Sequence, residues 1–411
     1  MIEHSVDVAV IGAGPAGLAA AKSAKENGAN NVLIIDRNSW LGGILTQCIH
    51  DGFGLEETGM SMTGPEYADL YIQEIKRIGI DVWKETMVLE VSKNREIVSV
   101  NRKGLHKIKA KSIILAMGCR EKTRWNIMIP GDRPSGIFTA GVAQAFINLY
   151  NIFPGKNVVI LGSGDVGLII ARRLKFEGAN VLGVVEILPH ASGLPRNVIQ
   201  CLDDYDIPIF LNHTITDIRG RERLESVTIS KIDNNMNPIS ESEKELKCDT
   251  LLLSLGLIPE NELSKNLGIE IDEATGGPII YQDYMTSLPG FFACGNCLQV
   301  YDNVDTLAKG ANQAGKNSVS WEINDSFINV KAGNNVNYVI PQRINKNEAV
   351  RFNLRVKKPM QNVKFFVKSG KDIFFKKTLK WVNPANMTEV IIEISNEILK
   401  SKKDLEVSID E

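Results

Sequence analysis

Residues 8–17 read Val-Ala-Val-Ile-Gly-Ala-Gly-Pro-Ala-Gly, an apolar run that leads into a glycine-rich turn. The apolar run predicts a β-strand, and the residues after the turn follow a helical pattern that ends at Gly28. A second apolar run, Val32 to Ile35, stops at Asp36. Strand, glycine turn, helix, strand and terminal acid are the parts of a βαβ unit that binds a dinucleotide.

The same pattern recurs 150 positions later in the chain. The run Val158 to Leu161 leads into Gly162-Ser-Gly-Asp-Val-Gly167, the next helical stretch ends at Gly178, and the run Val181 to Val185 stops at Glu186. In both copies the acid lies 24 residues after the first glycine. Two accidental turns would not share all of these features, so the sequence predicts two nucleotide sites.

Each position of the two glycine motifs has a physical role. The first glycine permits the tight turn out of the strand, and the second lacks a Cβ, so that a pyrophosphate can approach the backbone and the helix N-terminus. The third lets the helix and the strand pack closely, and the terminal acid is placed to accept hydrogen bonds from a ribose. These glycines are Gly12, Gly14 and Gly17 in the first copy and Gly162, Gly164 and Gly167 in the second.

Two further apolar runs each end in a glycine, at residues 112–118 and 250–256. Continuous runs of this kind suit parallel strands that are buried on both faces. Each would close one nucleotide-binding module, with its glycine (Gly118 or Gly256) letting the chain pass near the cofactor. Taken alone, either run could equally be an ordinary core strand.

The composition is that of an ordinary globular protein. The chain has 411 residues, 44% of them hydrophobic, which suits two or three domains. Its 47 basic and 49 acidic residues leave a net charge of −2, which gives no reason to expect nucleic-acid binding. No apolar run reaches the length of about 18 residues that spans a bilayer, and the N-terminus enters a strand-like run without a leader. We therefore expect a cytoplasmic protein with no transmembrane segment.

The charge distribution changes from about Val330 onward. Residues 331–411 hold 16 basic and 9 acidic residues, a net charge of +7, whereas the rest of the chain carries −9. The alternating runs 363–368, 390–394 and 405–409 predict a small antiparallel β domain. Its lysines suit a solvated face, and the alternative is a surface that steers an acidic partner.

Two helices outside the glycine motifs are also indicated. Thr63-Gly-Pro65 followed by Glu66 to Ile78 and Gly79 is typical of a capped helix with proline in its first turn and glycine at its end. Residues 302–320 contain alanines and glycines at helical spacing, which predicts a helix that packs closely against a neighbour.

With these motifs in order, the sequence resembles the two-dinucleotide-domain flavoproteins, which include thioredoxin reductase and the pyridine nucleotide-disulfide oxidoreductases. The resemblance covers about residues 5–325. It implies an α/β fold with two Rossmann-like dinucleotide-binding domains plus the small C-terminal β domain. The implied domains are an FAD-binding domain at 1–145 and 262–328, an NAD(H)-binding domain at 150–258 and a β-rich domain at 332–411.

The same resemblance implies which residues bind FAD. Asp36 would take the adenosine ribose, Gly42 and Gly43 would lie under the cofactor, and Asn296 would meet its ribityl-phosphate region. The family usually has Asp at this last position, so Asn296 removes one negative charge near the flavin. The implied FAD residues are Gly12, Gly14, Pro15, Ala16, Gly17, Asp36, Arg37, Gly42, Gly43, Ile44, Leu45, Val88, Ala116, Gly118, Gly295 and Asn296.

The second site is predicted to bind NADH rather than NADPH. The carboxylate of Glu186 would favour a free 2′-hydroxyl and repel a 2′-phosphate, and residues 187–193 supply no arginine. The alternative is a solvated acid at the end of a strand. The implied NAD residues are Gly162, Gly164, Asp165, Val166, Gly167, Glu186 and Gly256.

The cysteines do not match either arrangement of a disulfide reductase in this superfamily. The segment after Gly43 has one cysteine, Cys48, and the second domain offers only the widely separated Cys201 and Cys248. The exception is Cys294-Gly-Asn-Cys297, which is either a redox pair or a by-product of the FAD motif that it overlaps. No second ligand pair is spaced for a metal, so none is expected.

A closer resemblance narrows the predicted function. The stretches 42–54, 63–67, 118–121 and 138–141 look like those of the flavin subunits of opine, hydroxyproline and sarcosine-type dehydrogenases. They also resemble the reductase that accompanies anaerobic glycerol-3-phosphate dehydrogenase. The resemblance implies an FAD enzyme that moves electrons between NAD(H) and a second redox or dehydrogenase subunit, and it is compatible with a homo-oligomer. The chain departs from the pattern at Cys297, where an apolar residue is usual.

Two residues next to the predicted flavin contacts are candidates for catalysis. His50 could transfer protons, because imidazole exchanges protons near neutral pH, and Cys48 could be a nucleophile. A lone His or Cys is more often structural. Two alternative functions stay open: a thiol–disulfide reductase that uses Cys294 and Cys297, and a flavin-bearing structural subunit whose NAD site is not used.

Overall fold

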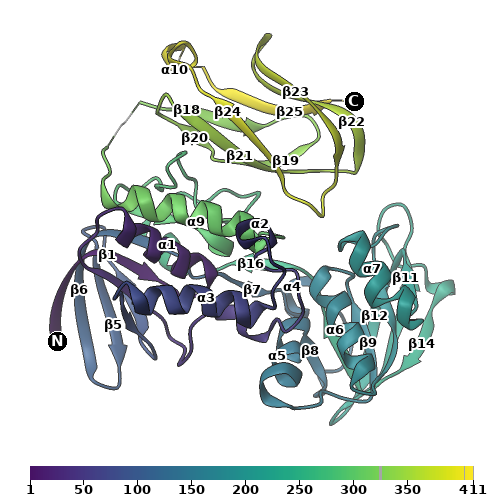
Figure 1. Ribbon diagram of the computed structural model, residues 1–411. Helices are drawn as coiled ribbons and strands as arrows, with labels where there is room; N and C mark the ends of the chain where they lie inside the picture. Colours follow the sequence, from purple (N-terminus) through teal and green to yellow (C-terminus); the bar gives the residue numbers. More distant parts are fainter. Residues whose placement is uncertain (324–325, 402, 411) are drawn as a thin grey trace. The chain divides into compact units, whose positions relative to one another are not determined.

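The computed structural model of the protein describes residues 1–323, 326–401 and 403–410. The chain separates into two compact units (Figure 1). Unit 1 combines Met1–Cys119 with Pro259–Glu411, and unit 2 is the intervening segment Arg120–Ile258. Each unit contains one glycine motif and one parallel sheet, which confirms the predicted α/β fold with two Rossmann-like modules.

A mainly parallel sheet forms the centre of the N-terminal part of unit 1. Its strands are β1 (Ile2–Ile11), β2 (Val32–Ile35), β3 (Asp81–Trp83), β4 (Met87–Val91), β5 (Glu96–Asn101), β6 (Gly104–Leu115) and β17 (Phe291–Ala293). The order is β3-β2-β1-β6-β5-β4, and β17 also pairs with β6. In β1, Val8 lies level with Val32 and with Ser112. Residues 112–115 of the run predicted at 112–118 are therefore the buried end of β6, beside the first glycine motif, and the strand ends before Gly118.

Helices α1 (Pro15–Glu26) and α9 (Val304–Val319) pack against each other through small residues. A Cβ on Gly315 would lie 2.1 Å from the carbonyl oxygen of Ala20, so the two backbones touch there. The hydroxyl of Ser23 donates a hydrogen bond to the carbonyl oxygen of Asn312 at 2.7 Å. The helix predicted at 302–320 is thus confirmed, and its close packing has the predicted cause.

Helix α3 (Gly64–Arg77) is the capped helix that the sequence predicts. The backbone N–H of Thr63 donates to Glu66 at 2.8 Å, and the Thr63 hydroxyl accepts from the backbone N–H of Glu66. The remaining short helices of unit 1 are η1 (Gly43–Gln47), α2 (Leu55–Thr58), α8 (Glu262–Leu267) and η4 (Gly295–Cys297).

The C-terminal part of unit 1 is a β domain with an apolar core of its own. Its elements are β18 (Ile328–Ala332), β19 (Val336–Ile340), β20 (Arg343–Ile344), β21 (Ala349–Val356), β22 (Met360–Ser369), β23 (Asp372–Val382), β24 (Thr388–Glu393), α10 (Asn396–Ser401) and β25 (Leu405–Asp410). They form the sheets β20-β18-β25-β22-β23 and β19-β21-β24, drawn in light green to yellow in Figure 1. The predicted β domain is confirmed.

Two details of this domain differ from the prediction. The strands begin at Ile328 rather than at residue 332. The pairing is not purely antiparallel, because β18 and β25 are parallel, with Val330 level with Leu405. Alternation of apolar and polar residues indicates strands but not their direction, and parallel neighbours are joined by long connections. Only the tertiary structure reveals this pair.

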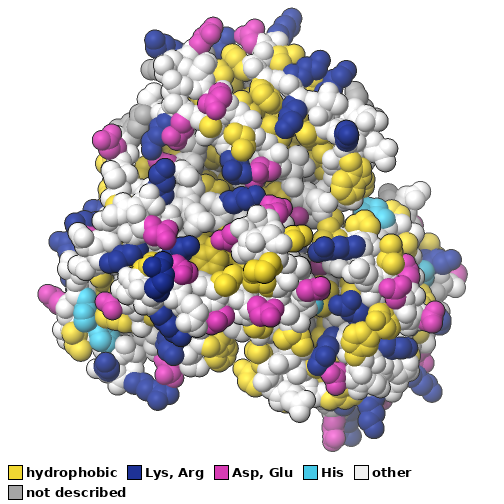
Figure 2. All heavy atoms as spheres, in the orientation of Figure 1, with side chains coloured by type: hydrophobic (Ala, Val, Ile, Leu, Met, Phe, Trp, Pro, Cys, Tyr) yellow, Lys and Arg dark blue, Asp and Glu magenta, His cyan; other side chains and the backbone are white. Residues whose placement is uncertain are grey.

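The basic residues of the β domain are mixed with other residue types on the face shown in Figure 2. On the face shown in Figure 2, Lys and Arg side chains of this domain are interspersed with hydrophobic, polar and acidic ones. Lys331 lies 2.6 Å from Asp404, and Lys368 lies 3.2 Å from Glu406. This arrangement fits the solvated face that the sequence suggests.

Unit 2 has a parallel sheet of order β11-β10-β9-β15-β8 and a second, antiparallel sheet of order β12-β13-β14 (Figure 1). The bounds are β8 (Ile137–Thr139), β9 (Asn157–Leu161), β10 (Asn180–Glu186), β11 (Ile209–Leu211), β12 (His213–Gly220), β13 (Leu224–Lys231), β14 (Lys244–Lys247) and β15 (Thr250–Leu253). The helices are α4 (Arg124–Ile127), α5 (Ala140–Tyr150), α6 (Asp165–Phe176), α7 (Pro195–Cys201), η2 (Asp203–Tyr205) and η3 (Ser240–Ser242). The strands β7 (Cys119–Glu121) and β16 (Leu257–Pro259) pair where the chain passes between the units.

The boundary between the modules differs from the expected domain limits. Residues 120–145, which the sequence analysis assigns to the FAD-binding domain, lie in unit 2. The reason is the pairing of β8 with β15, which places Phe138 level with Leu252. This strand completes the sheet of the second module rather than the first.

A buried histidine in β6 gives a pH-dependent contribution to stability. His106 Nε2 lies 3.0 Å from Asn101 Oδ1, and its Nδ1 lies 3.1 Å from Nε2 of His4. Burial lowers the pKa of His106, and His4, Lys103 and the N-terminal ammonium lower it further. The neutral ring donates to Asn101 and accepts from His4, whereas a protonated ring would have to donate to both.

We expect the free energy of unfolding to decrease as the pH falls below about 6.5, the ordinary value for histidine. The unfolded chain then binds a proton that the folded chain does not. Urea unfolding of the His106→Gln variant at pH 7.5 and pH 5 should show a weaker pH dependence than the wild type. The exposed His190, changed to Gln, serves as the control, and an unchanged pH dependence in His106→Gln would contradict the prediction.

Candidate functional site: two glycine turns

The first glycine turn has the close approaches that its three glycines predict. Gly12 has φ +108°, and a Cβ on it would lie 2.3 Å from the carbonyl oxygen of Ala116. A Cβ on Gly17 would lie 1.8 Å from the carbonyl oxygen of Gly12. Gly14 is different, because no atom lies within 4 Å of its missing Cβ. The turn is therefore tightly packed at Gly12 and Gly17. It is open at Gly14, at the N-terminus of α1.

This open position suits a phosphate group. Gly14 is the N-cap of α1, no side chain caps this helix end, and Pro15 stands in the first turn. The first backbone N–H groups of a helix have no partner within the helix, and the helix dipole favours an anion there. The residues of the turn thus fit the pyrophosphate of a dinucleotide.

Asp36 holds the turn to the end of β2. Its carboxylate accepts a hydrogen bond from the backbone N–H of Ala13 at 2.6 Å and another from that of Asn38 at 2.8 Å. The residues that follow Asp36 in the chain help to line an open hollow of about 630 Å³. The hollow is lined by Arg37, Asn38, Ser39, Trp40, Glu85, Val100, Asn101 and Arg102. Four of these residues, 37–40, follow Asp36 directly in the chain.

Of the residues that line this hollow, only Arg37 is predicted from the sequence as an FAD-binding residue. Trp40 and the Arg102–Glu85 pair, whose N and O atoms are 2.9 Å apart, were missed because they come from separate segments without a motif. Val88 is another residue that the family resemblance implies for FAD binding. Its side chain is buried in β4 and does not line the hollow.

The glycine pair after β2 lies against the first turn. The backbone N–H of Gly42 donates to the carbonyl oxygen of Ala13 at 2.8 Å, and a Cβ on Gly43 would lie 2.9 Å from Cα of Gly14. In the following turn Ile44 is 56% exposed, whereas Leu45 is buried. The pair therefore borders the open space over Gly14, and Ile44 rather than Leu45 is available to a ligand.

The other end of the predicted FAD site lies beside the same turn. Gly295 has φ +71°, and a Cβ on it would lie 2.5 Å from Cβ of Ala16. Asn296 follows directly; its Oδ1 accepts from the backbone N–H of Tyr301 at 3.0 Å, and its Nδ2 lies 3.6 Å from Sγ of Cys119. The structure thus brings residues 295–296 next to residues 12–17, although about 280 positions separate them.

The two candidate catalytic residues, Cys48 and His50, differ in their surroundings. Burial raises the pKa of the Cys48 thiol to about 12, and this thiol donates to the carbonyl oxygen of Ile44 at 3.4 Å. A thiol with so high a pKa is protonated at neutral pH and is a poor nucleophile. His50 is partly exposed, its Nδ1 lies 3.0 Å from the carbonyl oxygen of Asp51, and its ring contacts Phe53.

The segment that carries these residues is fixed by a carboxylate and two tyrosines. The hydroxyls of Tyr67 and Tyr71 donate to the carboxylate of Glu57 at 2.6 and 2.7 Å. The backbone N–H of Glu57 donates to Oδ1 of Asp305 at 3.0 Å, at the start of α9. The polar segment after the glycine pair is thus anchored on α3 and α9.

Cys294 and Cys297 are fully buried, and both are free thiols. The Cys297 thiol donates to the carbonyl oxygens of Leu115 at 3.1 Å and of Cys294 at 3.2 Å. Burial raises the pKa of Cys297 to about 12 and that of Cys294 well above its ordinary value. In this conformation neither sulfur is presented to a second protein.

The second glycine turn, in unit 2, repeats the geometry of the first. Gly162 has φ +95°, and a Cβ on it would lie 2.2 Å from the carbonyl oxygen of Ser254. A Cβ on Gly167 would lie 2.7 Å from Cβ of Ser254, whereas Gly164 has no atom closer than 3.5 Å to its missing Cβ. Gly256, with φ +88°, has open space around it. The second turn is again tightly packed at its first and third glycines and open at its middle glycine.

The residues that follow Gly164 have separate roles. The carboxylate of Asp165 accepts from the backbone N–H of Leu194 at 2.8 Å and from Nδ2 of Asn197 at 2.6 Å. It therefore holds the segment before α7. Val166 is 39% exposed beside it.

Glu186 is a buried acid that supports the second turn. Its side chain is only 4% exposed, and it accepts hydrogen bonds from the backbone N–H of Ser163 at 2.9 Å and of Leu188 at 3.0 Å. The hydroxyls of Ser163 and Ser192 also donate to it. The alternative of a solvated acid is thereby excluded. The serines are residues of the site that sequence reasoning missed, since no spacing rule connects them to Glu186.

Within the described ranges, no helix is long and apolar enough to cross a membrane. The same part of the chain has no group of three or more His, Cys, Asp or Glu residues arranged to hold a metal ion.

The family model described as pyridine nucleotide-disulphide oxidoreductase matches residues 6–315. Thioredoxin reductase from Bacillus subtilis (strain 168) is 26% identical over 312 residues, which are 72% of this chain and 87% of that protein. One of the opine oxidase subunits of Agrobacterium tumefaciens (strain Ach5) is 24% identical over 312 residues, which are 71% of this chain and 61% of that protein. Most first-ranking curated relatives are matched over only 46–60% of their length.

A solved structure has the same fold over the same part of the chain. The crystal structure of T. acidophilum thioredoxin reductase aligns with a TM-score of 0.62 and 23% identity, covering 77% of this chain and 98% of that one. The two open glycine turns fit the two dinucleotides that this family uses. The chain belongs to the pyridine nucleotide-disulphide oxidoreductase family.

Proposed function

We propose that this protein transfers electrons between NAD(H) and a second redox protein or dehydrogenase subunit, with FAD in unit 1 and the nicotinamide nucleotide in unit 2. The observation that carries the proposal is the duplicated turn, which is open at Gly14 and Gly164 and tightly packed at Gly12, Gly17, Gly162 and Gly167. The relative named as an opine oxidase subunit supports the existence of a partner, since that protein is one component of an enzyme.

The residues of the chain would bind and orient rather than react. The turn at Gly14 and the α1 N-terminus would hold the FAD pyrophosphate, the hollow beyond Asp36 its adenosine, and Asn296 its ribityl-phosphate region. FAD supplies the hydride chemistry when it is bound. The buried thiols Cys294 and Cys297 would be part of the wall of this site.

We also propose NADH rather than NADPH as the nucleotide. Glu186 places a negative charge at the end of β10, and residues 187–193 contain no arginine to pair with a 2′-phosphate. Because the carboxylate is engaged by Ser163 and Ser192, its effect would be the field of a fixed charge beside the turn.

A thiol–disulfide reductase is the second candidate. The spacing Cys294-x-x-Cys297 and the 26% identity to thioredoxin reductase favour it. The full burial of both sulfurs argues against a disulfide reductase, because a disulfide substrate must reach one of them. A third candidate is a flavin-bearing structural subunit. It would have the same two turns, but its NAD site in unit 2 would not be used in catalysis.

Anaerobic titration with NADH tests these candidates. We expect prompt bleaching of the flavin, at a rate at least about tenfold higher with NADH than with NADPH, because a 2′-phosphate near the Glu186 carboxylate adds a like-charge repulsion of at least about 1.4 kcal/mol that the neutral 2′-hydroxyl of NADH does not have. Two thiols gained per flavin on reduction, and lost in Cys297→Ser, would instead support the disulfide reductase. A flavin that dithionite reduces and NADH does not would support the structural subunit.

We also propose a cellular compartment and a partner for the protein. None of the six cysteines, all of which lie in the described ranges, forms a disulfide, which suits a reducing compartment such as the cytoplasm. The partner would be a redox or dehydrogenase subunit, and co-purification of such a protein with the full chain would identify it.

A further inference from the structure

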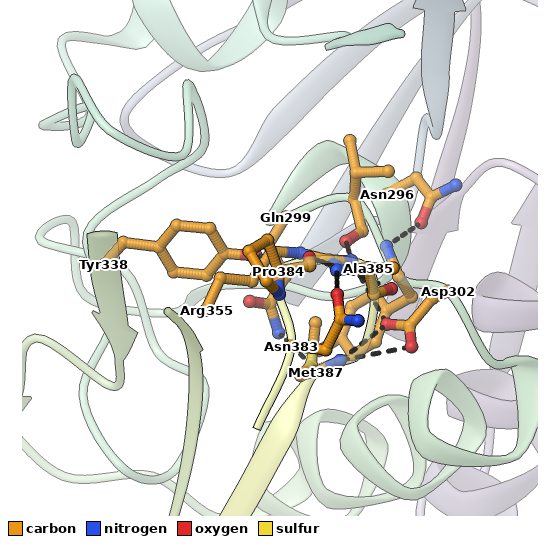
Figure 3. A network of polar contacts seen from close by, with 11 residues as sticks. Asn296, Gln299, Asp302, Tyr338, Arg355, Asn383, Pro384, Ala385 and Met387 are labelled. Carbon is orange, nitrogen blue, oxygen red and sulfur yellow. Dashed lines mark hydrogen bonds and ion pairs between the residues drawn. The ribbon is translucent and has the colours of Figure 1, made fainter. Parts of the chain in front are cut away.

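Arg355, on β21 of the C-terminal β domain, uses all of its donors in one network (Figure 3). A guanidinium group has five N–H bonds. Nε donates to the hydroxyl of Tyr338 at 3.0 Å, and Nη1 donates to the carbonyl oxygens of Pro384 at 2.8 Å and Ala385 at 3.1 Å. These three bonds tie β19 and the turn before β24 to β21, within the β domain itself.

The other two donors leave the β domain. Nη2 of Arg355 donates to the carbonyl oxygen of Val300 and to Oδ1 of Asp302, each at 3.1 Å. The carboxylate of Asp302 also accepts from the backbone N–H of Met387, with Oδ2 at 3.1 Å. The side chains of Arg355 and Asp302 are only 18% and 17% exposed, so this charge-assisted contact is shielded from water.

The segment that Arg355 holds leads directly to Asn296. Tyr301 lies between the two residues that Nη2 contacts, and its backbone N–H donates to Oδ1 of Asn296 at 3.0 Å. This bond fixes the orientation of the amide, so that Nδ2 points the other way, toward Cys119. Figure 3 shows Asn296 and Asp302 on the same short stretch of chain, with Arg355 approaching from the β domain.

We propose that Arg355 is a positioning residue of the flavin site, through which the C-terminal β domain sets the orientation of the Asn296 amide. The inference rests on the proposed function, which places the flavin at Asn296. Without the guanidinium, the Val300 carbonyl and the Asp302 carboxylate lose their shared partner, and Tyr301 is no longer held in place. Asn296 can then turn either its oxygen or its nitrogen toward the cofactor.

The test compares Arg355→Met with Arg343→Met in the full-length protein. Arg343 lies 2.5 Å from Glu270 and stacks over the ring of Phe327, so it also joins the β domain to the rest of unit 1. Its ion pair with Glu270 and its ring contact with Phe327 involve residues outside the stretch 296–302. Both changes remove one positive charge and one partly buried ion pair, which makes them a matched pair.

For Arg355→Met we expect the Kd for FAD to rise about tenfold, which corresponds to about 1.4 kcal/mol, together with a shifted visible spectrum of the bound flavin. Arg343→Met should keep the Kd within about twofold of the wild type and keep the spectrum. Arg355→Lys, which retains the charge but offers three donors, should fall between wild type and Arg355→Met, and it serves as the readout if the methionine variant does not fold.

The outcomes separate this inference from the function on which it rests. A yellow wild type with equal FAD affinity and spectrum in wild type, Arg355→Met and Arg355→Lys would overturn the positioning role alone. Equal losses in the Arg355 and Arg343 variants would also overturn it, because they would indicate general domain docking. A wild type that binds no FAD would overturn the proposed placement of the flavin itself.

Discussion

Gly14→Val is expected to fold normally and to purify without flavin. Gly14 has φ −73° and ψ −177°, a conformation that valine adopts without strain, and no atom of the chain lies within 4 Å of its missing Cβ. The new side chain would therefore occupy only the space over the turn, where the pyrophosphate meets the helix N-terminus. We expect FAD affinity to fall at least about 100-fold, or about 2.7 kcal/mol, measured by flavin absorbance and FAD titration.

The comparison with Gly17 shows why this variant is informative. A Cβ on Gly17 would lie 1.8 Å from the carbonyl oxygen of Gly12, so Gly17→Ala would disturb the turn itself and lose flavin by misfolding. Gly14→Val should instead keep the far-ultraviolet circular dichroism and the unfolding midpoint of the flavin-free wild type. A Gly14→Val protein that retains one FAD per chain would show that the cofactor does not approach this turn.

Gly164→Val is expected to remain yellow and to lose its reaction with NADH. Gly164 has φ −65° and ψ 158°, and the nearest atom to its missing Cβ is Oγ of Ser254 at 3.5 Å, an ordinary contact distance. Valine would again fill only the open space over the turn, this time in unit 2. We expect the rate of flavin reduction at a fixed NADH concentration to fall at least about 100-fold, which stopped-flow absorbance measures.

The two valine variants control each other, since each adds the same side chain to the same position of a repeated motif. Gly164→Val should bind FAD as tightly as the wild type, and dithionite should still reduce its flavin. Normal reduction by NADH in this variant would show that the nucleotide does not use the second turn. Loss of FAD from it would contradict the assignment of the two cofactors to two units.

Much of the fold could be predicted because its signals are local. Gly12 has φ +108°, and a Cβ on Gly17 would meet a carbonyl oxygen, so both positions require glycine. The turns can therefore be recognised directly from the sequence. Buried parallel strands require continuous apolar runs such as Val32–Ile35. The capping box between Thr63 and Glu66 spans only four residues.

The parts that were missed depend on partners that are distant in the sequence. Residues 137–139 could have paired with either sheet, and their pairing with β15 was decided by the packing of unit 2. The parallel pair of β18 and β25 joins strands at opposite ends of a domain. The burial of Cys294 and Cys297 likewise cannot be read from their spacing, which is the same in an exposed redox pair.

The sequence by itself determined that this protein has two dinucleotide turns, because the geometry of a tight turn restricts the residues that can form it. The tertiary structure alone decided what surrounds each turn: the serines that hold Glu186, the hollow beyond Asp36, and the hydrogen bonds from Arg355 to the segment after Asn296. These contacts join side chains from separate segments, and their energy depends on distance and burial in the folded chain. No local pattern of residues encodes them.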